Sequence, residues 1–218
     1  MNFKFYGKSL IIFSIALITP IFGWFVFYSL AQKSSNSFDP TPWIQDYVSS
    51  PGQILPPSKW AHVVSHEGVL KVRQGDSFLP LSEFKPSEGN LIFLTEAQGP
   101  TFAKVLYDFL KDNQLTKRVL VLAVSDGFLK DVRYYDGQLA LGAGQAYLIR
   151  LRALQSFALE NFLLINMSGI WLRPEIFTNS TQKLTDTFVR LHVPVFIGPI
   201  RRDEIHSLPK NANYLVID

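Results

Sequence analysis

The middle of the chain alternates short, nearly continuous hydrophobic runs with longer stretches of helical spacing. The runs Leu91–Thr95 and Val119–Val124 are apolar at almost every position, as is typical of parallel strands that are covered on both faces. The stretches after them, Phe102–Asn113 and Asp126–Tyr135, repeat their hydrophobic residues every three or four positions, as amphipathic helices do. Strand and helix therefore alternate with short loops, which predicts an α/β fold with a mostly parallel sheet.

The same alternation continues on both sides of these elements. Further strands are predicted at Trp60–Ser65, Leu139–Leu141, Phe162–Met167, Pro194–Ile197 and Tyr214–Ile217. Further helices are predicted at Pro42–Tyr47, Ala146–Gln155 and Asn179–Leu191, with a short helical turn at Asp203–Ser207. This number of strands fits either an open sheet or an incomplete barrel, and the periodicity does not choose between them.

The N-terminal region contains a long apolar segment that no soluble element requires. Ser9–Ala31 carries no charged residue and exceeds the roughly 20 residues that cross a bilayer as a helix. Lys4 and Lys8 precede it and only Lys33 follows closely, so the positive-inside rule places the N-terminus in the cytoplasm and the rest of the chain outside. We therefore predict a single-pass transmembrane anchor within residues 1–31.

A cleaved signal peptide is the competing interpretation of this segment. Ser29-Leu30-Ala31 resembles a small-x-small processing site. The apolar region is longer than the one usual in signal peptides, which favours the anchor. Both interpretations export the globular part.

A polar, proline-rich segment, residues 32–59, separates the predicted anchor from the alternating region. It begins with QKSSNSFDPT, which is typical of a flexible spacer. Its second part contains Pro51, Gly52, Pro56 and Pro57, which are too many breakers for regular structure between residues 49 and 59. The globular domain is therefore predicted over residues 60–218.

Charge and cysteine content exclude several functions. The formal net charge is +3, and Lys4 and Lys8 of the N-terminal segment contribute to it. The remaining charges are nearly balanced, so the domain lacks the basic face with which proteins bind nucleic acid. The chain contains no cysteine, which excludes disulfides, thiolate catalysis and a lipid-modified N-terminal cysteine.

Two side chains lie at predicted strand ends, where α/β barrels carry their chemistry. Glu96 directly follows Leu91–Thr95 and precedes a helix, so it is either a metal ligand or a cap of the first helical turn. His66 follows Trp60–Ser65 and is either a general acid–base residue or a surface histidine in the turn at Gly68.

Other candidates carry less weight. His62 falls inside a predicted strand and is interpreted as a packed or capping residue, and His192 and His206 lie in predicted loops. Gly142-Ala143-Gly144 could cradle a phosphate but lacks the third glycine of a nucleotide-binding loop. The sequence contains no zinc-ligand spacing, no P-loop and no G-x-S-x-G elbow.

Several segments carry signatures that occur together in one family. They are Val63–Leu70 (VVSHEGVL), Leu79–Phe84 (LPLSEF), Glu96-Ala97-Gln98, Val119–Ser125, Val189–Arg201 and Tyr214–Asp218. In this order they resemble the V-V-x-H-D-x-x-L, L-x-E, E-I-K, S-F, A-H-x-x-G-x-x-V-x-x-W-T-V-N and G-I-I-T-D segments of glycerophosphodiester phosphodiesterases. The resemblance covers Trp60–Asp218 and implies an incomplete or distorted (β/α)₈ barrel of the TIM type.

The resemblance also implies a chemistry. The family hydrolyses phosphodiesters with a divalent cation, so His66 would be catalytic and Glu96 would bind Mg²⁺ or Ca²⁺. The ligand would be a glycerophosphodiester or a phospholipid head group at the outer face of the membrane. Its H-R-G and E-x-D motifs, however, are missing ahead of His66, and Gln98 replaces the lysine of E-I-K.

The missing motifs leave open whether the chain is an enzyme. One carboxylate is too few for a divalent cation, and one histidine is too few both to activate a nucleophile and to protonate a leaving group. A degenerate barrel that serves as a binding or scaffold module is therefore favoured over an active phosphoric diester hydrolase. A third interpretation is an unrelated exported α/β domain whose similarity reflects convergent packing. If the resemblance holds, His66 and Glu96 should end neighbouring strands on one face, within ~10 Å of each other.

Overall fold

The computed structural model describes residues 42–75, 77–143, 147–149, 153, 167–174 and 179–217. All of them belong to one compact unit, which comprises Pro40–Leu163 and Met167–Asp218. The predicted anchor, most of the predicted helix Ala146–Gln155, and nearly all of the predicted strand Phe162–Met167 lie outside the described residues. Within the described ranges no helix has the length and apolar character needed to cross a membrane.

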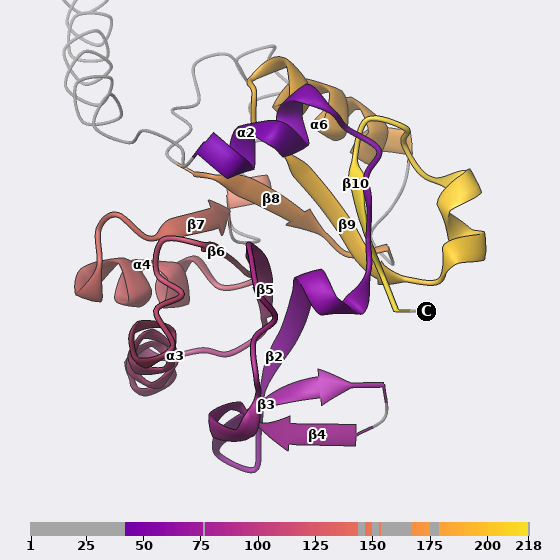
Figure 1. Ribbon diagram of the computed structural model, residues 1–218. Coiled ribbons are helices and arrows are strands. Elements are labelled where there is room, and N and C mark those ends of the chain that lie inside the picture. The colour runs from indigo at the N-terminus through magenta and orange to yellow at the C-terminus, as the bar shows by residue number, and fades with distance from the viewer. Residues whose placement is uncertain are drawn as a thin grey trace, which may run out of the picture. The chain divides into compact units, whose positions relative to one another are not determined.

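A ten-stranded sheet in the order β1-β10-β9-β8-β7-β6-β5-β2-β3-β4 forms the centre of the described part (Figure 1). Its strands are β1 Ile54–Leu55, β2 Trp60–His66, β3 Val69–Gln74, β4 Ser77–Pro80, β5 Leu91–Thr95, β6 Val119–Ala123, β7 Ala140–Ala143, β8 Gly169–Leu172, β9 Val195–Ile200 and β10 Asn213–Val216. Neighbouring strands from β1 to β2 in this order pair in parallel, whereas β2, β3 and β4 pair antiparallel. The predicted α/β class with a mostly parallel sheet is confirmed.

The helices follow from local sequence signals. They are α2 Pro42–Ser49, α3 Pro100–Asp112, α4 Asp126–Tyr135 and α6 Asn179–Arg190, with short 3₁₀ helices η1 Pro57–Lys59, η2 Leu81–Glu83 and η5 Arg202–Ser207. Pro100 begins α3 because its fixed φ suits the first helical position. Ser125 caps α4 by accepting a hydrogen bond from the backbone amide of Phe128 at 3.2 Å.

Alternate residues of each central strand enter two different hydrophobic clusters. In β5, Leu91 and Phe93 pack on the side covered by α3 and α4 (Figure 1). Ile92 and Leu94 face the other way, into a cluster whose members come from strands far apart in the sheet order. These members include Trp60, Leu120, Leu122, Trp171, Phe196 and Leu215. Side chains of distant strands can meet in this way only if the sheet curls, so the sheet is an unclosed barrel with its own interior.

The curled sheet is open between its two ends. β1 and β4 are its edge strands. On the β1 side of the opening lie Pro57, Pro199 and Ile217, and on the other side lie Arg73 and Gln74 of β3 and Gly75 after it. We call this opening the seam. The indole nitrogen of Trp60 in β2 donates a hydrogen bond to the carbonyl of Val216 in β10 at 3.2 Å, which links the two sides.

The segment ahead of residue 60 is more ordered than its proline content suggests. In α2, Ile44 is fully buried and the ring of Tyr47 lies 5.3 Å from that of Phe196, near the start of β9. The side-chain amide of Asn213 donates to the carbonyl of Tyr47 at 3.2 Å. The prediction that residues 49–59 lack regular structure is wrong, because β1 and η1 lie there and β1 pairs with β10. The short helix predicted at Pro42–Tyr47 is confirmed.

The β2–β3 hairpin was not predicted from the hydrophobic pattern. Its two turn residues, Glu67 and Gly68, have φ angles of 53° and 75°, as a type I′ turn requires. Leu70 and Val72 of β3 are buried between more exposed neighbours, but this alternation covers only five positions. The acidic–glycine pair in the turn was therefore the clearer signal in the sequence.

Candidate functional site

Three side chains meet inside the curled sheet, near the carboxyl ends of its strands. Glu96 follows β5, Arg173 follows β8, and His62 is the third residue of β2. One carboxylate oxygen of Glu96, Oε1, lies 2.8 Å from Nη2 of Arg173 and 3.2 Å from Nε2 of His62. We call these three residues the Glu96 cluster. It has two potential cations and one anion.

The backbone around Glu96 fixes the direction of its side chain. The Glu96 amide donates to the carbonyl of Val63 at 3.3 Å, which continues the β2–β5 pairing. The hydroxyl of buried Thr95 accepts from the Ala97 amide at 3.1 Å, and Ala97 is itself fully buried. Because side chains alternate along a strand, Glu96 points to the same interior side as Leu94. The side chain is 41% exposed, so it is open to a ligand.

Arg173 is held on two sides. It follows β8 on the face of Trp171, and its guanidinium lies 5.4 Å from the centre of the Trp171 ring. The other partner is the Glu96 carboxylate. A guanidinium stacked on an indole and paired with a carboxylate keeps a defined position while leaving further N–H donors available. Its side chain is 38% exposed.

His62 is the most buried member of the cluster. Its side chain is 8% exposed, and its ring packs edge-on against Trp171, with the ring centres 5.8 Å apart. Burial lowers the pKa of His62, the charges of Arg73 and Arg173 lower it further, and the Glu96 carboxylate opposes both effects. The net shift is downward, so the imidazole is neutral at pH 7.

The lowered pKa of His62 predicts how stability depends on pH. At pH values above the unfolded-state pKa of about 6.5, His62 is neutral in both the folded and the unfolded chain. Its protonation then does not lower the free energy of unfolding. As the pH falls through 6.5, the unfolded chain takes up a proton before the folded one does, so stability decreases. Replacing His62 with Gln should make the melting temperature less dependent on pH between 7 and 5. The surface substitution His66→Gln is the control and should keep the wild-type slope; equal slopes for both variants would contradict the assignment.

The structure places His66 away from the Glu96 cluster. The residue ends β2 three positions past Val63, the last β2 residue paired with β5, which is about 10 Å along the strand. Its side chain is 44% exposed and stacks on the ring of Phe78, with the ring centres 4.5 Å apart. Its Nε2 lies 3.8 Å from a carboxylate oxygen of Glu67. β2 and β5 are neighbours, as expected, but the described contacts of His66 are with Glu67 in the β2–β3 turn and with Phe78 in β4, and its catalytic role stays a prediction.

The structure also describes most of the weaker candidates from the sequence, which are the glycine-rich segment, His192 and His206. Gly142 and Ala143 lie buried in β7, and Gly144 is outside the described residues. His192 follows α6 in a turn with a φ of 57°, and His206 is exposed in η5. In the described part of the chain, the ion pairs of Glu96 are with His62 and Arg173, so these four described residues do not belong to the Glu96 cluster.

The cluster does not fit Mg²⁺ or Ca²⁺, the cations that the family resemblance implies. Among the described residues, no group of three or more His, Asp or Glu side chains is arranged to hold a metal ion. Such cations need several oxygen ligands, and the Glu96 oxygen already faces a guanidinium at 2.8 Å. A divalent cation at this oxygen would also be repelled by Arg173.

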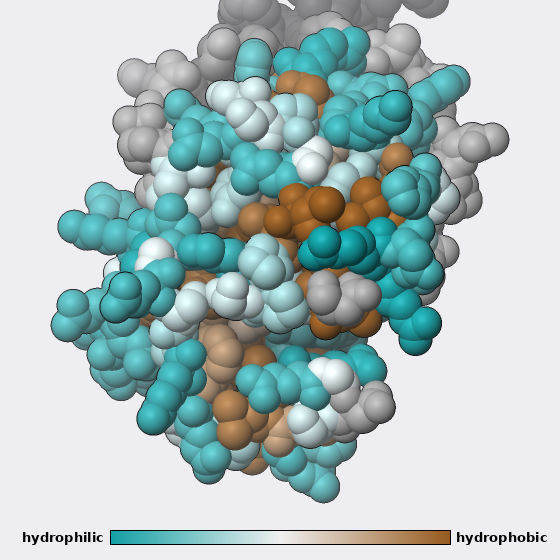
Figure 2. All heavy atoms as spheres, turned by 45° about the vertical axis from the view of Figure 1, so that its right-hand side comes forward, coloured by the Kyte–Doolittle hydropathy of each residue, from teal (hydrophilic) through white to brown (hydrophobic). Residues whose placement is uncertain are grey.

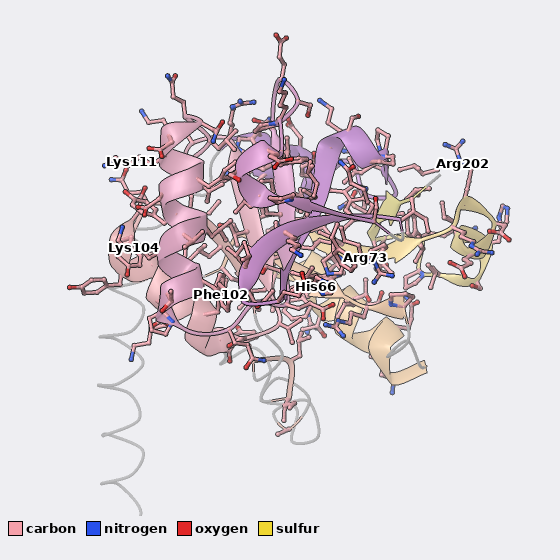
Figure 3. All side chains as sticks on the ribbon, turned by 90° about the horizontal axis from the view of Figure 1, so that it is seen from below. His66, Arg73, Phe102, Lys104, Lys111 and Arg202 are labelled. Carbon is pink, nitrogen blue, oxygen red and sulfur yellow. The ribbon has the colours of Figure 1, made fainter. Side chains whose placement is uncertain are left out.

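A cavity of about 670 Å³ opens beside the cluster into the seam. This size is typical of small-molecule sites. Its polar residues are His62, Arg73, Gln74, Glu96 and Arg173. Arg73 stands directly opposite His62 in the β2–β3 pairing, and in Figure 3 it lies between the hairpin and the C-terminal strands. Its Nε donates to the Gly75 carbonyl at 3.1 Å.

Among the charged residues of this site, Glu96 was predicted from the sequence. His62 was interpreted as a packed histidine, and it is buried, but it also belongs to the cluster. Arg73 and Arg173 were missed. The available signal for Arg173 was the pattern W-x-R directly after an apolar run, because it places an aromatic ring and a cation on one face of a strand end.

No family model and no curated protein matches the sequence. Solved structures that are similar to this chain include the following three. A glycerophosphodiester phosphodiesterase from Parabacteroides distasonis is 11% identical over 72% of this chain and 78% of that chain, with a TM-score of 0.46. A putative glycerophosphoryl diester phosphodiesterase from Silicibacter pomeroyi is 10% identical over 76% and 80%, with a TM-score of 0.48. A putative glycerophosphodiester phosphodiesterase from Galdieria sulphuraria is 8% identical over 78% and 84%, with a TM-score of 0.46. All three bear the name of the family that the sequence segments resemble.

Proposed function

We propose that this chain is a binding module that has the barrel of the glycerophosphodiester phosphodiesterases but not their metal-dependent hydrolysis. The curled sheet is then an incomplete (β/α)₈ barrel, and its cavity holds the anionic group of a phosphodiester or phospholipid head group. The observation that carries the proposal is the contact between Arg173 and Glu96 at 2.8 Å. A fixed guanidinium takes the place that a metal ion would need.

The charges around the cavity support an anionic ligand. Two guanidinium groups, Arg73 and Arg173, and one carboxylate, Glu96, leave a net charge of +1 when His62 is neutral. Guanidinium groups bind phosphate oxygens through paired N–H donors, which a metal-free site can use directly. The neutral imidazole of His62 adds a polar atom near Glu96 without adding charge.

The proposal includes the membrane. The apolar segment within residues 1–31 anchors the chain with its N-terminus in the cytoplasm, so the domain acts at the outer face of that membrane. An uncleaved anchor keeps the cavity close to phospholipids. The module would then work as a receptor or scaffold for a membrane-derived ligand.

A hydrolysis assay separates this proposal from an active phosphodiesterase. The full-length chain in detergent micelles is incubated with glycerophosphocholine or bis-p-nitrophenyl phosphate, in the presence of Ca²⁺ or Mg²⁺. We expect no turnover above that of the Glu96→Ala variant, since the cluster provides one carboxylate and that carboxylate is paired. Metal-dependent turnover that disappears in both Glu96→Ala and His66→Ala would instead establish the hydrolase.

A further inference from the structure

We infer that the ligand of the cavity is a single-chain amphiphile with one negative charge, whose head contacts Arg73 and Arg173 and whose apolar chain lies in the seam. This inference rests on the proposed function and specifies its ligand. A water-soluble glycerophosphodiester has no apolar part, so it would leave the apolar lining of the cavity uncovered.

The cavity has two chemically different walls. The wall at the Glu96 cluster carries the charged groups described above. The wall at the seam is apolar and includes Pro57, Trp60, Pro199 and Ile217, whereas Trp171 lies beside Arg173 and His62 at the charged wall. Figure 2 turns the C-terminal side of the sheet forward and shows apolar side chains (brown) exposed directly beside strongly hydrophilic ones (teal). A ligand that satisfies both walls must itself be amphiphilic.

The seam explains why the apolar wall is accessible from the side. β1 has a partner strand, β10, on one edge only, and η1 leads from it to β2 across the opening. Ile217 at the end of β10 is 51% exposed although it lines the cavity. An apolar chain that covers Ile217 and the neighbouring prolines removes this surface from water, which is favourable in proportion to the area covered.

The net charge sets the number of negative charges on the head. A monoanion neutralises the +1 charge of the cavity lining. A dianion would leave an unbalanced charge near the buried His62 ring. Both a phosphodiester and a carboxylate meet this condition, and the two heads are compared directly in the experiment.

The test measures binding of four small probes to the full-length chain in lipid nanodiscs. The probes are hexyl methyl phosphate, dimethyl phosphate, hexanoate and hexanol. Trp60 and Trp171 line the cavity, so tryptophan fluorescence reports occupancy. Hexyl methyl phosphate is expected to bind at least about tenfold more tightly than dimethyl phosphate, because the chain buries several CH₂ groups. Hexanoate carries the same single charge over the same number of charged oxygens, so its affinity relative to that of hexyl methyl phosphate distinguishes a lipid phosphodiester from a fatty acid.

Two variants with matched controls locate the two parts of the ligand. Ile217→Ser should weaken binding of hexyl methyl phosphate by several-fold and leave that of dimethyl phosphate unchanged. Val105→Ser, at a similarly exposed apolar residue of α3, should change neither. Arg73→Met should weaken both phosphates by about tenfold or more, whereas Lys111→Met on α3 should not. Lys111 lies far from the seam in Figure 3. Because the same nanodiscs are used throughout, partitioning of the probe into lipid cancels between variant and control.

The outcomes separate this inference from the proposed function. Equal binding of hexyl methyl phosphate and dimethyl phosphate would overturn the apolar part of the inference while leaving an anion-binding module. Binding of hexanol as tight as that of hexyl methyl phosphate would overturn the charged part. Absence of binding by both phosphates would overturn the proposed function itself.

Discussion

Replacing Arg173 with Glu is expected to create a divalent-cation site that the wild-type chain lacks. The substitution removes the guanidinium from Glu96 and places a second carboxylate next to it, so the oxygen ligands that Ca²⁺ needs increase while the competing cation disappears. At a Ca²⁺ concentration of about 100 times its Kd, binding stabilises the folded state by about 2.7 kcal/mol. For a domain of this size, that corresponds to a rise in melting temperature of roughly 5–10 °C.

The control for this substitution is Lys104→Glu on α3. Lys104 pairs with Asp108 at 2.7 Å, so this variant also replaces a cation next to a carboxylate with a second carboxylate. It lies on an exposed helix surface, away from the cavity (Figure 3), and should show no comparable response to Ca²⁺. If Arg173→Glu responds no more than Lys104→Glu, or if the wild type is stabilised by Ca²⁺ to the same degree, Arg173 does not occupy a cation position.

Replacing Gly142 with Ala is expected to destabilise the sheet by about 3 kcal/mol. A Cβ at this position would lie 2.0 Å from Cδ2 of Leu122 and 2.8 Å from the backbone oxygen of Gly169, its partner in β8. Leu122 could move only into the packed barrel interior, and the backbone oxygen cannot move without breaking the β7–β8 pairing. The melting temperature should fall by roughly 6–12 °C.

Gly137→Ala is the matched control, because an added Cβ there meets nothing within 4 Å. Its melting temperature should stay within about 2 °C of the wild type. Equal effects of the two substitutions would show that Gly142 is not needed for packing. The expected difference would also explain the G-A-G segment of the sequence by close packing between neighbouring strands, without a phosphate-binding role.

Local patterns in the sequence predicted the central strands and helices well. The strand Leu91–Thr95 and the helix Asp126–Tyr135 have the predicted bounds, because the strand is a continuous apolar run, the helix has helical spacing, and both are bounded by turn or cap residues. β1 and β3 could not be predicted in the same way. β1 has two residues and depends on pairing with β10, at the other end of the chain, which no local pattern encodes.

The candidate site shows the same limit for side chains. Glu96 was recognised because its position at a strand end is visible in one short segment. Its partner Arg173 follows β8, which is separated from β5 by β6 and β7 in the sheet. Neighbouring strands lie about 4.8 Å apart, so in a flat sheet the two residues would be well over 10 Å from each other. Only the curl of the sheet brings them into contact, and curvature is a property of the whole domain.

The histidine that contacts Glu96 is not the one that the family resemblance selected, and the catalytic role of His66 stays a prediction. The V-V-x-H similarity selected His66, which lies at the tip of the β2–β3 hairpin. His62 and His66 lie four residues apart on the same face of β2, so the sequence pattern alone does not tell which of them reaches Glu96. His62 contacts Glu96 because it lies within the part of β2 that pairs with β5.

Calorimetric titration of the full-length chain with hexyl methyl phosphate, first with EDTA and then with Ca²⁺, tests the central claim most directly. A site whose cation is Arg173 binds the anion without a metal, so the two affinities should agree within about twofold and no hydrolysis product should form. Binding that requires Ca²⁺, or release of product when Ca²⁺ is added, would contradict the claim and show that Glu96 holds a catalytic metal.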